Sequence, residues 1–352
     1  MSSIARTLGR ARYTLAQGAR VAWYMSHYML ARRLSAPFNR PGEPKFEPRS
    51  DPGAPERIRA SYLALFAKDR ANIEAGLYPA PSDFGASQAI DAVRLSARFF
   101  ADLPRVDQRR VARNATEVRN TNADASRYPA YYLQNFHYQT GGWLTEESAE
   151  LYDTQVEVLF GGAADAMRRI ALGSLARGLR GRDQRRVRLL DIACGNGRFL
   201  TQILGAFPRM PVVGLDLSPA YVEKARDALK PWSQAEVVVG QAEKAPFDDA
   251  HFDAATSVFL FHELPPRVRA EVARELARIV KPGGVLIFAD SLQTGDAPDL
   301  DQMLEYFPVG FHEPYYGSYL DTDFVQLFAE AGFAHEETEL AFLTRVMRFR
   351  RS

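Results

Sequence analysis

The stretch LLDIACGNGRFL, residues 189–200, contains the residue types of a ligand-binding turn. An apolar run ends in Asp191, Gly195 and Gly197 follow it, and a helical pattern begins after Asn196. Glycines permit a tight turn and let a ligand approach the backbone, and the first N–H groups of the following helix are free to donate. The stretch therefore predicts a site for a nucleotide-like ligand. Its spacing lacks the third glycine of a dinucleotide fingerprint, which argues against a pyrophosphate cradle.

Polar residues also follow the next two apolar runs. Asp216 ends VVGLDL, where a carboxylate can accept hydrogen bonds from both hydroxyls of a ribose. Gln241 and Glu243 follow the third run, where the edge of an adenine would lie. Ligands of open α/β sheets bind at the carboxyl ends of the strands. We therefore expect three successive strand ends to present polar groups to one crevice. One acidic residue at a strand end is often only a helix cap, but capping alone does not explain three in register.

Strand-like apolar runs alternate with helical patterns from residue 187 onward, and these elements must position the polar residues. The runs are 187–193, 211–217, 235–240, 251–261 and 283–290. Helical patterns separate them after Asn196, after Pro219 and from about residue 264. Such alternation implies βαβ units and a parallel, doubly wound sheet. We therefore predict an α/β fold with a mostly parallel sheet.

The ordered motifs resemble those of the class I S-adenosylmethionine-dependent methyltransferases. They are LLDIACGNGRFL, GLDLSP, GQAEKAPF, FDAATSVFLFHELPP and LARIVKPGGVLIFAD. The resemblance covers about residues 187–350, and KPGG together with FAEAGF is most similar to the small-molecule and quinone-type branch. It implies a Rossmann-like, seven-stranded sheet, with S-adenosylmethionine as cofactor and S-adenosylhomocysteine as product.

The resemblance also implies which residues bind the cofactor. They are Asp191, Gly195 and Gly197 around the methionine part, Asp216 at the ribose, Leu217, Gln241 and Ala242 around the adenine, and Phe259 beside the donated methyl. Many members of the family have Asp where this chain has Gln241. A glutamine oxygen can still accept a hydrogen bond from the adenine amino group, so Gln241 is kept in the predicted site.

The acceptor side of the site has a candidate in His262, within SVFLFHELPP. It is interpreted either as a general base or substrate contact, or as a structural histidine at a helix start. The motif [DN]PP[YFW] of enzymes that methylate amino groups of adenine or glutamine is absent. Methyl transfer needs no metal, because the sulfonium already makes the methyl electrophilic. No two histidines have the spacing of a local metal motif, and we expect no metal.

Residues 291–323 form a long connection rich in aromatic residues, which is typical of a lid or binding loop. His312 and Tyr316 are its candidate catalytic residues. The alternative is that its rings only seal the lid onto the domain.

A second aromatic stretch, YYLQNFHYQTGGW at 131–143, precedes the predicted cofactor domain. Its polar residues include Asn135 and His137, and buried groups of this kind need partners, of which a ligand is one. The stretch forms either a substrate- or cofactor-facing wall, with His137 as a catalytic candidate, or packing between a cap and the core.

We predict an N-terminal, mainly helical cap over 1–145 and a methyltransferase domain over 146–352. Within the cap, 86–103 has helical spacing that the sequence DLPR ends, and 36–58 is a Pro- and Gly-rich linker. Residues 1–35 carry arginines and no acidic residue, in the pattern of a basic amphipathic helix. This helix docks on the protein itself, lies on a membrane surface, or belongs to a targeting segment.

Composition limits the choice of function. The net charge of +1 among 352 residues provides no overall electrostatic attraction to nucleic acid, so no nucleic acid is expected as a partner. The single cysteine, Cys194, excludes an intrachain disulfide and fits a reducing, cytoplasmic location, with membrane association through 1–35 left open. We predict methyl transfer to a small acceptor that is aromatic, quinone-like or lipid-like. The alternatives are a protein or RNA methyltransferase, helped by the arginines of 177–188, and a non-catalytic module that binds the cofactor.

Overall fold

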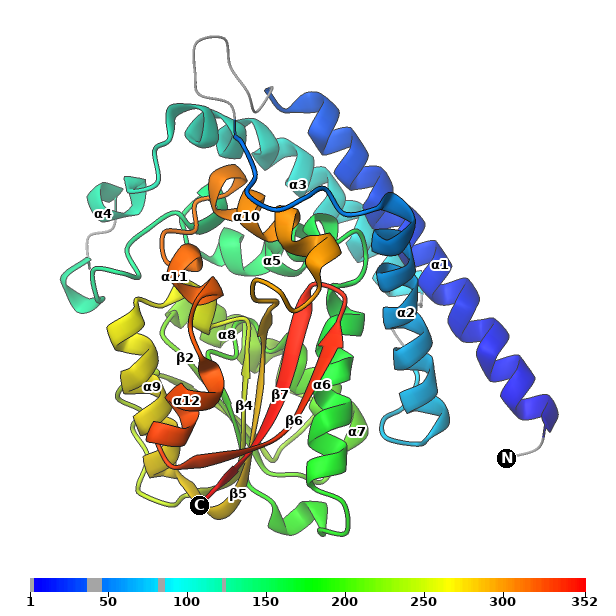
Figure 1. The fold of residues 1–352 in the computed structure, drawn as a ribbon, viewed down its shortest axis with the longest axis vertical. Helices are drawn as coiled ribbons and strands as arrows, with labels where there is room; N and C mark the ends of the chain where they lie inside the picture. The colour runs from blue at the N-terminus through cyan, green and yellow to red at the C-terminus, as the bar shows by residue number, and fades with distance from the viewer. Residues whose placement is uncertain (1–2, 37–45, 82–85, 122–124) are drawn as a thin grey trace.

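The computed structural model describes residues 3–36, 46–81, 86–121 and 125–352, and a seven-stranded sheet lies at its centre (Figure 1). The strand order is β3-β2-β1-β4-β5-β7-β6. Strands β1 to β5 pair in parallel, and only β7 runs antiparallel to its neighbours β5 and β6. The predicted mostly parallel, seven-stranded α/β sheet is therefore confirmed. The strands are β1 (Leu189–Ile192), β2 (Val212–Asp216), β3 (Ala235–Val239), β4 (Phe252–Val258), β5 (Val280–Ser291), β6 (Phe333–Ala341) and β7 (Thr344–Arg351).

Helices cover both faces of this sheet. One apolar core contains side chains of α6 (Ala164–Gly178), α7 (Arg198–Ala206) and α8 (Pro219–Leu229). A second core contains side chains of α9 (Pro266–Ile279) and α12 (Phe324–Glu330). Burial on both faces explains why the central strands read as continuous apolar runs instead of alternating patterns.

The N-terminal region is helical, as predicted. It comprises α1 (Ser3–Leu34), α2 (Pro55–Glu74), α3 (Ala86–Ala112), α4 (Glu117–Thr121), η1 (Ala125–Arg127), η2 (Phe136–Tyr138) and α5 (Glu146–Leu159). Figure 1 shows α1 and α2 beside each other at the outside of the molecule, and α3 and α5 above the sheet. The hydroxyl of Thr145 accepts a hydrogen bond from the Ser148 N–H, so Thr145 caps α5 where a helix start was expected.

The prediction that α3 would end at residue 103 is wrong. The helix continues through Pro104 to Ala112. Tertiary contacts hold the part beyond the proline: Arg109 is buried, and its guanidinium donates to the carbonyl of Tyr138 and the hydroxyl of Thr140. A proline removes one backbone hydrogen bond of a helix, and here the docked side chain outweighs that local loss.

The described residues just before α2, 46–54, run over the predicted lid. Of the predicted linker 36–58, residues 37–45 lie outside the described residues. After them, the backbone N–H groups of Arg49 and Ser50 donate to the carboxylate of Glu305, and Arg57 pairs with Asp299. The predicted lid 291–323 contains η5 (Pro298–Leu300), α10 (Asp301–Gly310) and α11 (Tyr316–Leu320). The segment before α2 is thereby fastened to α10 and η5.

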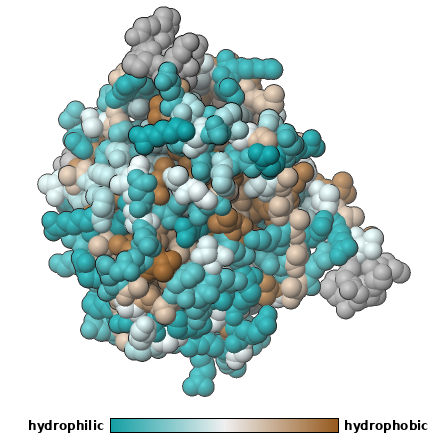
Figure 2. All heavy atoms as spheres, viewed as in Figure 1, coloured by the Kyte–Doolittle hydropathy of each residue, from teal (hydrophilic) through white to brown (hydrophobic). Residues whose placement is uncertain are grey.

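Helix α1 docks through polar side chains. Arg20 lies 2.8 Å from both Glu157 and Asp165, and the Tyr13 hydroxyl donates to Asp69 at 2.6 Å. The expected apolar side of the helix faces outward, because Leu8 is 65% exposed and Leu15 is 75% exposed. In Figure 2, hydrophobic residues appear in brown at the right of the view, where Figure 1 places α1. None of the described helices is long and apolar enough to cross a bilayer.

Candidate active site

The glycine-rich turn after β1 has the geometry that its sequence predicts. Gly195 has φ +57° and Gly197 has φ +81°, both in the left-handed region that favours glycine. The Gly195 N–H donates to Asp216 Oδ2 at 2.9 Å, so the turn and the end of β2 are joined directly. A side chain at Gly197 would approach Ala225 of α8 at 3.1 Å, which explains the close packing of α7 against α8.

A pocket opens above the carboxyl ends of β1, β2 and β4. Five of the eight predicted cofactor residues line it: Gly195, Asp216, Leu217, Ala242 and Phe259. Aromatic side chains form much of the remaining wall, namely Tyr131, Tyr132, Phe136, Trp143, Tyr152 and Tyr221. The strand ends therefore meet at one crevice, but of the polar residues expected to face it, Asp191, Asp216, Gln241 and Glu243, Asp216 alone lines the pocket.

The other three predicted cofactor residues do not line this pocket. Asp191 is buried at the end of β1, where Oδ1 accepts a 2.6 Å hydrogen bond from the Thr256 hydroxyl. Gly197 is the N-cap of α7, and Gln241 takes part in an isolated bridge with Lys244. Their roles toward the cofactor remain predictions.

The residues present fit an unphosphorylated nucleoside with a thioether or sulfonium side arm. Each carboxylate oxygen of Asp216 accepts one backbone N–H, from Gly195 or from Ser218, and each has a further lone pair for a ribose hydroxyl. A side chain built on Gly195 would meet only Tyr221, at 3.9 Å, so space remains above the turn. Leu217 and Ala242 offer apolar surface for a flat ring.

Burial perturbs both carboxylates beneath the pocket. It raises the pKa of Asp216 to about 6, although the N–H groups of Ser218 and Gly195 oppose this shift. Burial also raises the pKa of Asp191 to about 7, against the opposing hydrogen bond from Thr256. The cost of burying a charge that lacks a cationic partner explains both directions.

We expect cofactor binding to weaken as the pH falls through about 6. Protonation of Asp216 replaces two strong charged acceptors with a neutral carboxyl, whereas ribose hydroxyls need an acceptor. The affinity for S-adenosylhomocysteine should therefore be full well above pH 6 and reduced at pH 5, measured by isothermal titration calorimetry. The variant Asp216→Asn should lose the component of this pH dependence centred near 6. An affinity that stays constant between pH 5 and 8 in the wild-type protein would contradict the assignment.

Different residues of the 131–143 stretch line the pocket and pack in the protein interior. Tyr131, Tyr132, Phe136 and Trp143 line the pocket. Asn135 is fully buried in the seam instead, where Oδ1 accepts from the Val118 N–H and Nδ2 donates to the Gln139 carbonyl. Both interpretations of the stretch therefore apply, each to its own residues.

His262 lies just after β4, in η4 (Phe261–Glu263), and its imidazole is paired with a carboxylate. Its Nδ1 lies 2.6 Å from Asp290 Oδ1 at the end of β5, and both residues are buried. Burial would lower the pKa of His262, but the attraction of Asp290 outweighs it and raises the pKa to about 9. The imidazole is then protonated at neutral pH, which suits a hydrogen-bond donor better than a general base.

Two of the three remaining predicted catalytic residues, His137 and Tyr316, lie near η4. His137 Nε2 lies 3.0 Å from Glu313 Oε1, and the Tyr316 hydroxyl lies 2.5 Å from the Ser291 hydroxyl. The ring of Tyr316 is 6.1 Å from that of His262. His312 turns toward the cap instead, with Nε2 2.7 Å from Gln134 Oε1, and burial lowers its pKa.

Of the carboxylates beside η4, Glu313 was expected with His312 in the pocket or lid, whereas Glu263 and Asp290 were not predicted as site residues. Glu263 lines the pocket, Glu313 is buried beside His137, and Asp290 pairs with His262. Burial, and then repulsion by Glu313, raises the pKa of Glu263 well above its usual range. The neighbouring histidines at 262 and 312 were the available signal, but only the fold shows that the acidic residues meet.

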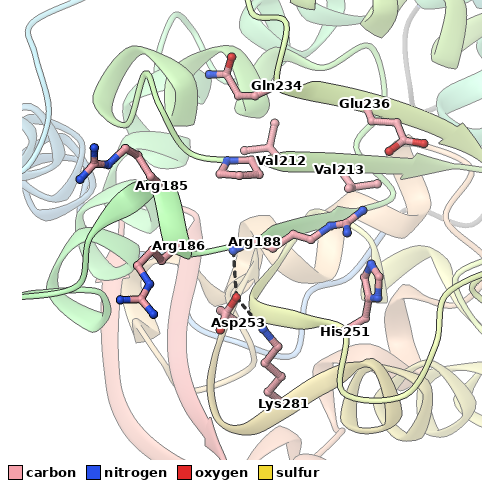
Figure 3. Close-up of a pocket in the computed structure, with 11 residues that line it drawn as sticks. Arg185, Arg186, Arg188, Val212, Val213, Gln234, Glu236, His251, Asp253 and Lys281 are labelled. Atoms are coloured by element: carbon pink, nitrogen blue, oxygen red, sulfur yellow. Dashed lines mark hydrogen bonds and ion pairs between the residues drawn. The ribbon is translucent and has the colours of Figure 1, made fainter.

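A second hollow lies at the opposite ends of the strands (Figure 3). Arg185, Arg186 and Arg188 of the predicted basic cluster line it, together with Asp253 and Lys281. Asp253 Oδ2 accepts from the Arg188 N–H and from Lys281 Nζ, both at 3.0 Å, as the dashed lines in Figure 3 show. This hollow is remote from the carboxyl ends of the strands, where ligands of such sheets bind.

Comparisons with known proteins match part of the chain to methyltransferases. Residues 189–284 match a family described as a methyltransferase domain. The chain is 36% identical over 108 residues to 2-methyl-6-phytyl-1,4-hydroquinone methyltransferase of Synechocystis, covering 31% of this chain and 33% of that protein. It is 29% identical over 119 residues to demethylmenaquinone methyltransferase of Lysinibacillus sphaericus, covering 34% and 50%.

The similarity is confined to part of each protein. The chain spans about a third to a half of the length of these two relatives. A solved structure of a methyltransferase dependent on S-adenosylmethionine from Aquifex aeolicus aligns with 52% of this chain and 89% of its own, at 18% identity and a TM-score of 0.40. Residues 189–284 therefore match a methyltransferase domain, and the ordered motifs and the seven-stranded sheet around them are similar to those of class I S-adenosylmethionine-dependent methyltransferases.

Proposed function

We propose that the protein transfers a methyl group from S-adenosylmethionine to a small organic acceptor that is aromatic, quinone-like or lipid-like. One observation carries the proposal: the pocket at Gly195 and Asp216 continues into a wall of aromatic residues contributed by the N-terminal region. The relatives named for hydroquinone and demethylmenaquinone substrates support this acceptor class. We also propose the division into a cap over 1–145 and a methyltransferase domain over 146–352.

The bound cofactor supplies an electrophilic methyl on a sulfonium sulfur. The chain binds and orients its partner: Asp216 holds the ribose, and Phe259, with φ +58°, lies at the end of β4 in the pocket wall. Tyr132 and Trp143 cover the pocket and exclude water, which favours in-line attack by a positioned acceptor. In the transfer, the acceptor atom bonds to the methyl carbon, and the electron pair of the broken bond remains on sulfur.

An acceptor hydroxyl must also lose its proton. Glu263 lines the pocket, and its raised pKa makes its ionised carboxylate a stronger proton acceptor, whereas His262 is bound to Asp290 and carries its own proton at neutral pH. We propose that the acceptor hydroxyl faces Glu263, and that His262 and Asp290 position the η4 turn. His137, His312 and Tyr316 are proposed to border the acceptor, as residues of the cap and lid.

A labelled-methyl assay tests this function. Purified protein and labelled S-adenosylmethionine are incubated with a cell extract, which is then separated into lipid, small-molecule, RNA and protein pools. The proposal expects label in the lipid or small-molecule pool. Label in the protein or RNA pool would show that the acceptor is a macromolecule instead of a small molecule. Label in no pool, with cofactor binding intact, would favour a non-catalytic binding module. Asp216→Ala is the control for transfer that does not depend on the site.

We further propose that α1 touches a membrane surface. Its docked side is polar, while Leu8, Leu15 and Met29 are exposed, and residues 1–35 carry arginines without acidic residues. A helix of this kind binds anionic lipid through its apolar side chains and its basic charge. A lipid-like acceptor would then be reached at the surface where it resides.

Vesicle co-sedimentation tests α1 directly. We expect the full chain to sediment with vesicles containing anionic phosphatidylserine and to remain in solution with neutral phosphatidylcholine. The double variant Leu8→Gln/Leu15→Gln should bind less, because it removes exposed apolar area without touching the docked side of α1. Leu63→Gln, at an exposed leucine of α2, is the matched control. Equal sedimentation of the wild type, the double variant and Leu63→Gln would contradict the proposal that α1 touches a membrane surface.

A further inference from the structure

Three acid–base side chains from distant segments meet beside the pocket. His137 comes from η2, Glu263 from η4, and Glu313 from the connection between α10 and α11. One ligating atom of each lies within 4.8 Å of those of the other two. Methyl transfer as proposed needs one group near the acceptor at most, so a histidine and two glutamates in one place call for a further explanation.

Glu313 indicates that a ligand belongs at this place. Its side chain is 0% exposed, and neither carboxylate oxygen has a hydrogen-bond partner among the residues that the structure describes. Oε1 does lie 3.0 Å from His137 Nε2, but without the geometry of a hydrogen bond. Carboxylates inside proteins are either paired and hydrogen-bonded or coordinate a metal, because an unsatisfied one is costly.

We propose that His137, Glu263 and Glu313 bind a first-row divalent cation such as Mn²⁺ at the edge of the acceptor pocket. One imidazole and two carboxylates form a donor set that suits Mn²⁺, Fe²⁺ or Zn²⁺. Two donors about 2.1 Å from a metal and at right angles to each other lie about 3.0 Å apart. The separation of 3.0 Å between His137 Nε2 and Glu313 Oε1, which is also an ion-pair distance, therefore matches that of adjacent ligands.

The surrounding contacts hold two of these ligands in place before any metal binds. The His137 N–H contacts the His312 carbonyl at 3.4 Å, which joins η2 to the segment that carries Glu313. Gln134 strengthens this link through His312 Nε2 and the Tyr315 hydroxyl. Supporting contacts of this kind orient metal ligands and contribute to affinity.

Three protein ligands leave coordination positions open toward the pocket, because Glu263 also lines it. Oxygen atoms of an acceptor can fill them, and an acceptor with two adjacent oxygens, as in a catechol or a hydroxyquinone, can occupy two. This part of the inference rests on the proposed function, since it places the metal beside that acceptor. The sequence showed no metal motif because the three ligands come from separate segments.

Mn²⁺ binding to the full-length protein tests the site without relying on activity. After treatment with a chelator, Mn²⁺ is titrated and the free ion is followed by electron paramagnetic resonance. We expect one bound Mn²⁺ in the wild type. Glu313→Gln and His137→Gln should each weaken it by about 100-fold or more, since even supporting residues around metals contribute 10- to 100-fold. Glu330→Gln, at an exposed glutamate of α12, should bind like the wild type.

Thermal unfolding shows that each variant is folded, and calorimetry with S-adenosylhomocysteine is performed on the same samples. Bound cofactor without bound Mn²⁺ in the wild type overturns the metal site and leaves the proposed function standing. Bound Mn²⁺ without bound cofactor overturns the proposed function alone. Equal Mn²⁺ affinity in the wild type and Glu313→Gln also overturns the site. So does stabilisation of the wild type by a small protonated alkylamine and not by Mn²⁺, which would identify a pocket for an ammonium group.

Discussion

Replacing Asp216 with alanine is expected to weaken the binding of S-adenosylhomocysteine by at least about 100-fold, measured by isothermal titration calorimetry. The carboxylate lines the pocket, where we propose that it accepts hydrogen bonds from two ribose hydroxyls, and hydrogen bonds to a charged group contribute about 1.5–3 kcal/mol each. Loss of about 2.8 kcal/mol corresponds to 100-fold in affinity. The same change removes the acceptor of the Gly195 N–H, so the turn above β1 also loses an anchor.

Two variants distinguish the loss of the ribose contact from the loss of the anchor of the turn. Asp216→Asn keeps the shape and one side-chain oxygen, and should bind with an affinity between those of the wild type and Asp216→Ala. Asp227→Ala removes an exposed carboxylate from α8 and should leave affinity unchanged. Wild-type affinity in Asp216→Ala would show that the cofactor does not use the end of β2, and the site would have to be assigned again.

The part of the site that could be predicted from the sequence is local in the chain. Gly195, Gly197 and Asp216 are found by spacing because a parallel sheet brings successive strand ends to one edge, whatever the rest of the chain does. The apolar runs predicted the central strands for a similar reason, since burial on both faces requires continuous apolar sequence.

The acceptor side could not be predicted in this way. The aromatic stretch marks His137 as a candidate, but its meeting with Glu263 and Glu313 depends on how the cap and the lid pack above the sheet. Docking of helix α1 on the protein was one of the expected interpretations, but its partners could not be predicted for a related reason, because the carboxylates of Glu157 and Asp165 that pair with Arg20 lie in α5 and α6. Partners separated by more than a hundred residues leave no periodic signal in a sequence.

Such long-range partners also determine how the N-terminal helices are held, and Asp69 of α2 is the clearest case. It is fully buried, and its carboxylate accepts hydrogen bonds from the hydroxyls of Tyr13 in α1 and Tyr78, and from both Nε and Nη2 of Arg169 in α6. Burial, and then Asp69, raises the pKa of both tyrosines, so they remain donors. One carboxylate therefore joins α1, α2 and α6.

Asp69→Ala is expected to lower the free energy of unfolding by about 3–5 kcal/mol, the cost of leaving one partner of a buried ion pair alone. Urea unfolding followed by circular dichroism measures it. The double variant Asp69→Ala/Arg169→Met should be more stable than Asp69→Ala, because it no longer buries an unpaired guanidinium. A loss below about 1 kcal/mol in Asp69→Ala would mean that water reaches Arg169 once the carboxylate is gone. The interface of α1 and α2 with α6 would then open independently of the methyltransferase domain, and cofactor binding should survive the variant unchanged.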